Sequence, residues 1–424
     1  MKNYITMWPD QKLIVPDNPI IGVLEWDGIG KEIVGEMMRL VDAGVKSEYD
    51  DSKKINREQL LIGEDAYAQT WSHLPESTIT ELKRMLVGIK WPTNTPLGWW
   101  HASVNVWLRK ELDLGVCWRP VKYFPGVKSP VVHPENVAID IFRENVEWSY
   151  VGVEFDQSET QVLFDRLAAT YPEKLSRVAF QKNVVVGLDF ASEYASKRIM
   201  RAGLEFAIKN KKRSVTITSK PNIKKIVDGN FQKRCLQVCH EEFQDYCYSA
   251  EEAKMIWEEY ARIKKVEWWL EAEKFRKSKF IDIGKIEVQT LITDNFFQQI
   301  LLRPEDYDAV VAQNLNGDYI SDALAAQVWG IGIAPGWNIN YQTGHAVFEA
   351  THGTAPLIYG KWLANPTSID LSAVMLLNYI ERTKAAQAIT TSIEKTLANG
   401  QRTGDLWWSL WTREYTDALI ANLQ

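Results

Sequence analysis

Short apolar runs alternate along the chain with longer stretches in which apolar residues recur every three or four positions. The first run, 19–30 (PIIGVLEWDGIG), predicts a buried strand that ends in a glycine-rich turn. The next stretch, 31–45, has the spacing of an amphipathic helix, and further short runs that end in polar residues lie at 137–145, 214–220 and 309–318. Alternating strands and helices are typical of an α/β fold whose strand ends present functional side chains.

Three other segments complete this pattern. Residues 251–279 carry mixed charges at helical spacing and predict a pair of surface helices, and residues 365–400 predict one or two helices that stop at Gly400. Residues 148–192 have weaker helical signals and alternating β-rich residues, as in 177–190 (RVAFQKNVVVGLDF), which indicates an inserted subdomain. No internal repeat or low-complexity segment interrupts the chain.

Composition narrows the class of protein. The 424 residues are 46% hydrophobic and 25% charged, which suits a globular protein with two lobes. The chain has 49 Lys and Arg and 55 Asp and Glu, so its net charge is −6. It therefore lacks the positive field that nucleic-acid binding needs. No apolar run approaches the roughly 20 residues that span a bilayer, and no apolar segment follows Lys2 as in a secretory signal. We therefore expect a cytoplasmic protein without membrane or nucleic-acid partners.

The four cysteines are too few for a disulfide framework. Cys235, Cys239, His240 and Cys247 are close in sequence, which raises the alternative of a metal site. Cys235 and Cys239 are four residues apart on the apolar stripe of a predicted helix, however, and no second pair has zinc-finger spacing. Buried thiols are the interpretation that this pattern favours.

Three arginines within 35 residues are candidates for anion binding. Arg119 and Arg143 end apolar runs, where burial is costly without an anionic partner, and Arg109 precedes them. A guanidinium group can hold both oxygens of a carboxylate, so the set suits a substrate with several carboxylates; internal salt bridges are the alternative for each arginine. Ser103 and Asn105 add short hydrogen-bonding groups just upstream.

Acidic residues provide a candidate metal site. Asp318 and Asp322 are four residues apart in NLNGDYISDALAAQ, so a helix there puts both carboxylates on one face, and Asp294 is a third acid in an apolar segment. Such oxygen ligands suit Mg²⁺ or Mn²⁺, whereas the alternative is a helix cap with a solvated neighbour. Lys220, at the end of a predicted strand, is a candidate base, and Tyr150 is a candidate acid.

Together these residues resemble the decarboxylating isocitrate dehydrogenases of the isocitrate/isopropylmalate dehydrogenase family. The resemblance extends from NPIIGVLEWDGIG to EYTDALI and depends on Ser-x-Asn before three Arg, IFREN followed by Tyr, NLNGDYISDALAAQ and FEATHGTAP. It implies a two-lobed α/β fold with a small inserted clasp. The implied divisions are a large domain with the nucleotide loops (1–114 and 329–424), a small domain with metal and dimer contacts (115–147 and 193–328) and the clasp (148–192).

The resemblance also implies a reaction: oxidation and decarboxylation of isocitrate to 2-oxoglutarate and CO₂, with reduction of NAD or NADP. It implies that isocitrate is held by Ser103, Asn105, Arg109, Arg119 and Arg143. Lys220 would act as base and Tyr150 as proton donor, and Mg²⁺ or Mn²⁺ would be bound by Asp294, Asp318 and Asp322. The implied nucleotide-binding residues are Thr95, His352, Gly353, Thr354, Ala355 and Asn365. The implied assembly is a homodimer in which Asp294 and Lys220 reach the partner's site.

The nucleotide loops depart from the family pattern. Leu357 and Ile358 replace the Lys-Tyr pair of NADP-specific bacterial members, and Gly404 and Trp408 replace a Tyr and an Arg. Because a phosphate dianion needs a cation, these changes favour NAD over NADP, although the Asp that NAD-specific members place at position 357 is also absent.

The 18 tryptophans are a second departure. Several occupy positions where the family carries Gly: Trp26, Trp91, Trp99, Trp100, Trp329, Trp407 and Trp408. Glycine is used where φ is positive or where the backbone approaches a ligand closely, so each exchange costs strain or space. Two alternatives to an active isocitrate dehydrogenase remain open: a relative that acts on isopropylmalate or homoisocitrate, and a catalytically silent scaffold that retains the fold.

Overall fold

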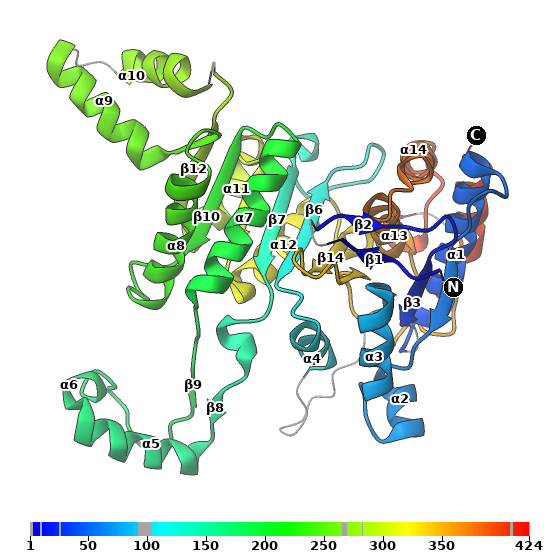
Figure 1. The fold of residues 1–424 in the computed structure, drawn as a ribbon, viewed down its shortest axis with the longest axis horizontal. Helices are drawn as coiled ribbons and strands as arrows, with labels where there is room; N and C mark the ends of the chain where they lie inside the picture. Colours follow the sequence, from blue (N-terminus) through cyan, green and yellow to red (C-terminus); the bar gives the residue numbers. More distant parts are fainter. Residues whose placement is uncertain are drawn as a thin grey trace.

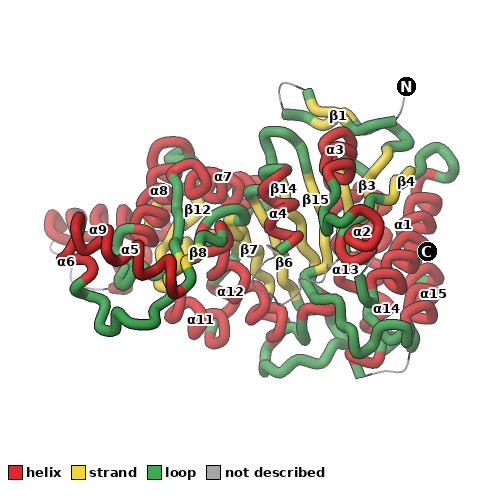
Figure 2. The backbone as a smooth tube through the Cα atoms, turned by 90° about the horizontal axis from the view of Figure 1, so that it is seen from below, coloured by secondary structure: helices red, strands yellow, loops and turns green. Residues whose placement is uncertain are grey.

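A computed structural model describes residues 3–8, 11–24, 27–91, 103–264, 269–281, 283–407 and 410–423. Thr95 and the tryptophans at 26, 99, 100 and 408 lie outside the described residues. The described chain is organised around an 11-stranded sheet with helices on both faces, which confirms the α/β class (Figures 1 and 2).

The sheet is mostly parallel. Only the pairs β6–β7, β6–β14 and β14–β15 are antiparallel. In spatial order the strands are β11 (Cys247–Ser249), β12 (Ile286–Ile292), β10 (Ser214–Ser219), β13 (Ala309–Ala312), β7 (Ala138–Glu144), β6 (Val116–Lys122), β14 (Pro335–Ile339), β15 (Ala346–Ala350), β5 (Val87–Lys90), β3 (Ile20–Leu24) and β4 (Asn56–Gln59). The runs at 19–30, 137–145, 214–220 and 309–318 each contain one of these strands, as predicted.

One half of the sheet is built from the two ends of the chain. One face of this half is covered by four helices that pack against one another: α1 (Gly30–Tyr49), α13 (Thr367–Tyr379), α14 (Thr383–Ala398) and α15 (Thr412–Ala421). The opposite face carries α2 (Gly63–Thr70), α3 (Glu76–Met85) and α4 (Val104–Glu111), and a small ribbon of β1 (Thr6–Met7) and β2 (Leu13–Ile14) lies at the edge. The predicted helical segments 31–45 and 365–400 are confirmed, the second as two helices.

The other half of the sheet is formed by the middle of the chain. On one face lie α7 (Glu193–Lys209) and α8 (Val227–Glu242), and on the other α11 (Thr293–Leu302) and α12 (Asn314–Gln327). The halves are joined where β6 pairs with β14, with Trp337 opposite Trp118. This seam coincides with the boundaries expected near 115 and 329, and the division into domains stays a prediction.

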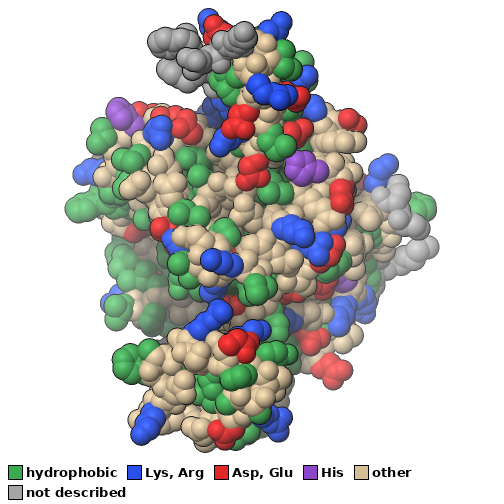
Figure 3. Space-filling view, turned by 90° about the vertical axis from the view of Figure 1, so that its left-hand side faces the viewer, with side chains coloured by type: hydrophobic (Ala, Val, Ile, Leu, Met, Phe, Trp, Pro, Cys, Tyr) green, Lys and Arg blue, Asp and Glu red, His purple; other side chains and the backbone are tan. Residues whose placement is uncertain are grey.

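Two segments project from this half (Figure 1). Residues 250–281 form the expected helix pair, α9 (Ala250–Lys264) and α10 (Trp269–Arg276). The clasp segment (148–192) holds α5 (Gln157–Thr170), α6 (Pro172–Leu175) and a ribbon of β8 (Glu154–Phe155) and β9 (Val186–Gly187). The strands expected over 177–190 are limited to two residues of β9, because most of this stretch is exposed and has little to pack against. The space-filling view shows Lys and Arg interspersed with Asp and Glu, without a dominant positive surface (Figure 3).

The cysteines are buried thiols, as the sequence pattern favours. All four thiols are free and buried, and the Sγ atoms of Cys239 and Cys247 lie 2.8 Å apart between α8 and β11. Within the described ranges no three His, Cys, Asp or Glu side chains gather as ligands for a metal ion. None of the helices in the same ranges is long and apolar enough to cross a membrane.

Tryptophan occupies glycine-like backbone at several turns. Of the 18 tryptophans, five lie outside the described residues; of the 13 described, five have a positive φ: Trp71, Trp148, Trp329, Trp362 and Trp407. Nine of the 23 described glycines have a positive φ, but only eight of all other described residues do. Because a Cβ disfavours this conformation, tryptophan shares the backbone preference of glycine in this chain rather than that of bulky residues.

Replacing Trp71 by Gly should stabilise the protein. Trp71 ends α2 with φ of 59°, and its side chain is 82% exposed, so little packing is lost with the ring. The variant loses the strain of a left-handed backbone at a residue with a Cβ, which stabilises the folded state. The greater conformational entropy of glycine in the unfolded chain offsets part of this gain, so the free energy of unfolding should rise by about 1 kcal/mol. Denaturant unfolding measures this change. The control is Trp411→Gly, where φ is −74°, and an equal gain in that variant would contradict the explanation.

Candidate active site

Arg119 and Arg143 meet beside the first turns of α12. They lie on the antiparallel neighbours β6 and β7, and α12 follows β13, which pairs with β7. The Arg119 side chain donates to Asp318 Oδ1 at 3.0 Å and to Ser321 Oγ at 2.7 Å. Arg143 also donates to Asp318 Oδ1, and its Nη2 lies 2.7 Å from Asn314 Oδ1. Two guanidinium groups thus share one carboxylate.

Close packing of α12 on β7 makes this contact possible. A Cβ at Gly317 would lie 2.8 Å from the Arg143 Cβ, so the glycine lets the helix approach the strand. Arg143 is 1% exposed, and a charge buried this deeply needs an anionic partner. The sequence-predicted pair Arg119 and Arg143 is therefore brought together, with Asp318 as its partner.

Tyr150 completes the cluster. It lies in the 3₁₀ turn Trp148–Val151, its hydroxyl donates to Asp318 Oδ2 at 2.7 Å, and the Arg143 guanidinium lies 4.9 Å from its ring centre. A phenol is ordinarily protonated at neutral pH, and burial raises the pKa of Tyr150 further. Although burial alone would raise the pKa of Asp318, Arg143 and Arg119 hold it below its usual value, so this carboxyl is ionised.

Arg109 is held next to this cluster by a second buried carboxylate. Glu349 on β15 accepts from Arg109 at 3.0 Å and from Asn338 on β14 at 2.8 Å, and its other oxygen lies 2.9 Å from Lys90 Nζ at the end of β5. Despite complete burial, Lys90 and Arg109 hold the pKa of Glu349 far below its usual value. Asn338 also accepts from Asn145, the residue that follows β7, so the network crosses the seam between the halves.

Ser103 and Asn105 lie at the start of α4, the helix that carries Arg109. Ser103 is the N-cap residue of this helix, and both side chains are half-buried. The helix therefore presents the predicted Ser-x-Asn pair and Arg109 from one rigid element.

Lys220 and Asp294 form a separate pair. Lys220 follows β10, Asp294 lies in the first turn of α11 after β12, and their side chains form an ion pair. No described contact joins this pair to Asp318 within the chain. The nearest link is Thr293, whose Oγ1 accepts from Asn316 on α12 at 3.4 Å. The structure thus divides the predicted catalytic residues into two groups.

The predicted metal ligands follow the same division. Asp318 and Asp322 lie one turn apart on α12, and Asp322 is half exposed and 3.5 Å from Arg119. Burial raises the pKa of Asp322 even though Arg119 lowers it. Paired carboxylates on one helix face suit the oxygen preference of Mg²⁺ or Mn²⁺. Asp294 points to its own Lys220 instead, so one chain supplies two of the three expected ligands at this place.

The predicted nucleotide residues lie in the turn after β15. The Thr354 carbonyl oxygen accepts from Ile29 at 3.2 Å and leaves no space for a Cβ on Gly28, so this turn packs on the start of α1. Gly353 is exposed, and Ala355 has a φ of 43°. Burial lowers the pKa of His352, whose Nε2 is buried without a partner among the described residues. That neutral, unsatisfied imidazole suits a site that receives a ligand's polar group.

Tryptophans border this region. Trp91 is buried, and its ring lies edge-on to the His352 ring, with the two ring centres 5.1 Å apart. The Trp91 ring also fills the space beside Gly30. Asn365, another predicted nucleotide residue, donates to Asp405 at 3.1 Å. The backbone oxygen of Asp405 accepts from Trp329, so the segments around residues 329, 365 and 405 are tied to one another.

Several residues of the site escaped sequence reasoning. Glu349, Lys90 and Asn338 lie inside apolar strands, where a buried acid such as Glu349 in AVFEA is itself a sign of a paired charge. Asn314 and Ser321 share the NLNGDYISDALAAQ motif with Asp318 but were not singled out. Their role as partners of the arginines depends on how α12 packs on β6 and β7.

The chain is similar to known proteins over nearly its whole length. The isocitrate/isopropylmalate dehydrogenase family model matches residues 20–419. A Staphylococcus epidermidis protein named isocitrate dehydrogenase [NADP] is 41% identical over 424 residues, with 97% of each chain covered. A Streptococcus mutans protein of the same name is 42% identical over 419 residues, covering 97% of this chain and 98% of the other.

Solved structures give the same result. The isocitrate dehydrogenase from Methylococcus capsulatus matches with a TM-score of 0.75 and 25% identity, covering 96% of this chain and 99% of the other. The TT0538 protein from Thermus thermophilus matches with a TM-score of 0.76 and 28% identity, covering 99% and 71%. The family resemblance and the fold expected from the sequence are thereby confirmed.

Glu349→Gln should strongly destabilise the protein, because it leaves Lys90 and Arg109 buried without a charge partner. Loss of one member of a buried ionic group costs about 3–5 kcal/mol. The matched control is Glu394→Gln, which removes the exposed ion pair with Lys122 and should cost less than about 1 kcal/mol. Denaturant unfolding of both variants measures the two costs, and equal costs would contradict the assigned role of Glu349.

Proposed function

Because the chain belongs to the isocitrate/isopropylmalate dehydrogenase family, we propose that it oxidises and decarboxylates isocitrate to 2-oxoglutarate and CO₂. The observation that carries this proposal is the buried cluster of Arg119 and Arg143 around Asp318, with Arg109 beside it. Three guanidinium groups suit a substrate with three carboxylates, because each can hold both oxygens of one carboxylate. The relatives named isocitrate dehydrogenase [NADP], which align over 97% of this chain, support the same activity.

The chain's own residues divide the work of the reaction. Arg109, Arg119 and Arg143 bind and orient the substrate, and Ser103 and Asn105 offer hydrogen bonds from the start of α4. Bound NADP supplies a hydride acceptor, and bound Mg²⁺ or Mn²⁺ supplies positive charge next to the oxygen that becomes negative during decarboxylation. Asp318 and Asp322 would hold the metal ion, together with Asp294 of the partner subunit.

Proton transfer falls to Lys220 and Tyr150. The partner's Lys220, as the neutral amine, would take the proton of the substrate hydroxyl while the carbon gives its hydride to the bound nicotinamide. Tyr150, like any phenol, is protonated at neutral pH, and burial raises its pKa further, so its hydroxyl has a proton to give to the carbon that has lost CO₂. Its hydrogen bond to Asp318 Oδ2 fixes the hydroxyl beside the arginines that orient the substrate.

NADP is the cofactor that we propose. The expected preference for NAD is not supported, because the relatives' names specify NADP. Leu357 and Ile358 carry no charge, but Lys361 is exposed in the same turn, where its backbone N–H donates to the Ile358 carbonyl oxygen at 3.1 Å. Lys361 therefore offers a cation to a 2′-phosphate within four residues of the position where bacterial NADP-specific members carry Lys.

Turnover with the two nucleotides tests the activity and this choice. With isocitrate and Mg²⁺, the protein should reduce NADP faster than NAD, and isopropylmalate should give no comparable rate. Lys361→Ala should lower kcat/KM for NADP about tenfold by removing a charged hydrogen bond, without changing kcat/KM for NAD. The matched control is Lys384→Ala, an exposed lysine on α14.

Two results would contradict these proposals. Absence of turnover with either nucleotide, while isocitrate with Mg²⁺ still raises Tm, would favour the catalytically silent scaffold. Equal effects of Lys361→Ala on both nucleotides would remove Lys361 from the phosphate site.

We further propose a homodimer with shared active sites. In one chain, the Lys220–Asp294 pair and the Arg119–Arg143–Asp318 cluster have no contact among the described residues, and this separation supports a site to which another subunit contributes the pair. The clasp segment exposes apolar side chains, among them Phe180 at 86% exposure, which suits burial against a second copy. Free buried cysteines agree with a reducing compartment, and we propose a cytoplasmic location.

Mixing two inactive variants tests shared sites. Lys220→Met and Asp318→Asn should each abolish turnover, but a heterodimer of the two contains one site with both native residues. After denaturation and refolding of an equal mixture, half of the dimers are mixed, so about a quarter of wild-type activity should return. Refolding of each variant alone is the control. If the mixture stays inactive although mass spectrometry detects heterodimers, the two residues act in the same chain.

A further inference from the structure

Glu32 lies in the first turn of α1, beside the turn that carries Lys361. Its side chain is buried, with 4% of its surface exposed, and both of its oxygens accept hydrogen bonds from backbone N–H groups of that turn. Oε1 accepts from Gly360, and Oε2 accepts from Trp362 at 2.9 Å. Gly360 and Trp362 are the two neighbours of Lys361 in the chain. One buried carboxylate therefore holds the backbone on both sides of the lysine that we propose for the 2′-phosphate.

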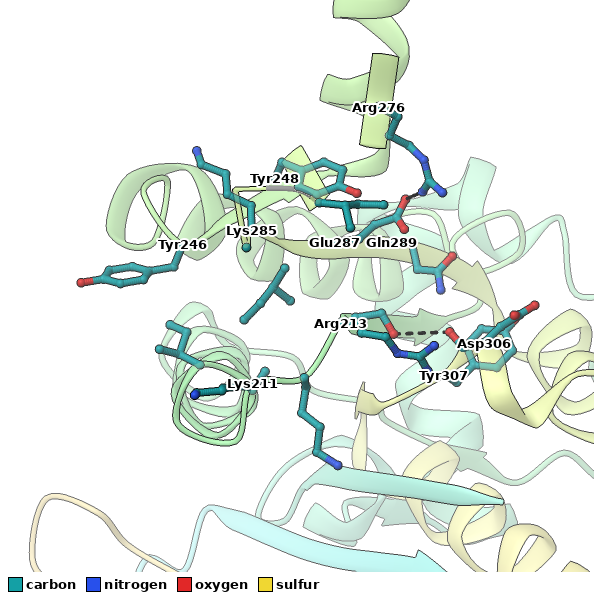
Figure 4. Close-up of a pocket in the computed structure, with 17 residues that line it drawn as sticks. Lys211, Arg213, Tyr246, Tyr248, Arg276, Lys285, Glu287, Gln289, Asp306 and Tyr307 are labelled. Atoms are coloured by element: carbon teal, nitrogen blue, oxygen red, sulfur yellow. Dashed lines mark hydrogen bonds and ion pairs between the residues drawn. The ribbon is translucent and has the colours of Figure 1, made fainter. Parts of the chain in front are cut away.

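Glu32 differs in its partners from Asp318 and Glu349, which neutralise buried cations. In the cavity of about 710 Å³ near the starts of β10 and β12, Glu287 is likewise paired with Arg276 (Figure 4). Among the described residues, by contrast, Glu32 has no Lys or Arg partner. Its charge is stabilised by the two backbone N–H groups and by the positive end of the helix dipole at the start of α1. The carboxylate of Glu32 therefore acts on the turn and not on a cation.

The turn itself has few other contacts. All residues from 356 to 363 except Ile358 are exposed, so packing contributes little to its conformation. Gly360 and Trp362 both have a positive φ, 79° and 54°, and this backbone is costly for Trp362 because the residue has a Cβ. One further backbone bond, from the Thr412 N–H to the Trp362 carbonyl oxygen at 2.9 Å, ties the end of the turn to α15. The two charge-assisted bonds to Glu32 are therefore a main constraint on the turn.

We propose that Glu32 is a positioning residue for the nucleotide. By holding the N–H groups of Gly360 and Trp362, it keeps the turn in the conformation that presents Lys361 to the 2′-phosphate. This role rests on the proposed function, because it takes NADP as the cofactor. When the hold is lost, only a fraction of the molecules has the binding conformation, and the apparent dissociation constant rises by the inverse of that fraction.

Amide hydrogen exchange of the full-length protein without nucleotide tests the hold on the turn. Glu32→Gln keeps the size of the side chain but replaces one acceptor oxygen by an amide nitrogen that cannot accept. Exchange over residues 356–363 should therefore become at least about tenfold faster. Glu32→Asp keeps the charge but shortens the reach, and it should change the exchange in the same direction. Unchanged exchange in both variants would overturn the role.

The matched control is Glu36→Gln, one turn further along α1. This carboxylate is also buried, at 6% exposure, but it pairs with Arg39 and does not contact the turn. Glu36→Gln should leave exchange over residues 356–363 unchanged. Equal acceleration by Glu36→Gln and Glu32→Gln would mean that the turn responds to any loss of charge on α1, and would overturn the role.

Calorimetric titration with NADP and with NAD tests the effect on the nucleotide. Glu32→Gln should raise Kd for NADP about tenfold and Kd for NAD by less, since NAD lacks the phosphate that meets Lys361. In a Lys361→Ala background, Glu32→Gln should leave the ratio of the two affinities unchanged, because its effect passes through that lysine. A purely structural role would lower Tm without changing this ratio. A further change of the ratio in the double variant would overturn the positioning of Lys361 by Glu32.

These measurements separate the positioning role from the proposed activity, because neither exchange nor binding requires turnover. A protein without turnover whose preference for NADP is removed by Glu32→Gln would contradict the activity and support the role. If the wild type prefers NADP and Glu32→Gln leaves that preference intact, the role alone fails. If the wild type binds NADP no more tightly than NAD, the proposed cofactor and the role of Glu32 both fail.

Discussion

The carboxylate of Asp318 neutralises two buried guanidinium groups that would otherwise repel each other. Arg119 and Arg143 project from adjacent strands, and without an anion between them neither could stay buried at low cost. The same carboxylate also accepts the Tyr150 hydroxyl, so strand, helix and turn meet at one acid. These side chains are therefore ordered without a ligand, and under the proposed function an incoming carboxylate meets arginines that are already oriented. Binding of a metal ion to Asp318 would leave both guanidinium groups available for the substrate.

Glu349 likewise neutralises buried cations, close to the seam where β6 pairs with β14. Lys90 ends β5, Arg109 lies on α4, and Asn338 connects to the residue after β7, so one acid links both halves of the molecule. The two carboxylates hold Arg109, Arg119 and Arg143 in neighbouring positions although these arginines come from three elements. Under the proposed function, substrate positioning consequently depends on the integrity of the seam as well as on the residues that touch the substrate.

Sequence reasoning predicted the fold class and the buried strands, which the structure confirms, because their signals are local. The catalytic candidates named by the same reasoning stay a prediction. The β-rich run before Asn145 is visible as periodicity, whereas the helix expected from Asp318 begins four residues earlier, at Asn314, inside the run predicted as β-rich. Arg143 and Asp318 are unusual in such places. Partners of these charges could not be predicted in the same way. Glu349 meets Arg109 across 240 positions, and such pairing follows from strand order rather than from spacing. The separation of Lys220 from Asp318 was implied only by family resemblance.

The backbones of Trp329 and Trp407 have positive φ, a conformation that favours glycine and that a side chain with a Cβ makes costly. This backbone preference has a consequence for the codons at these positions. The codon UGG differs from the glycine codon GGG only in its first base, as UGA differs from GGA. If one codon marks the tryptophans with positive φ and is missing at Trp107 and Trp118, whose backbone is ordinary helix and strand, that codon is read as glycine in the native host. The backbone angles of this chain thus give a criterion, independent of the gene, for choosing between Trp and Gly at these positions.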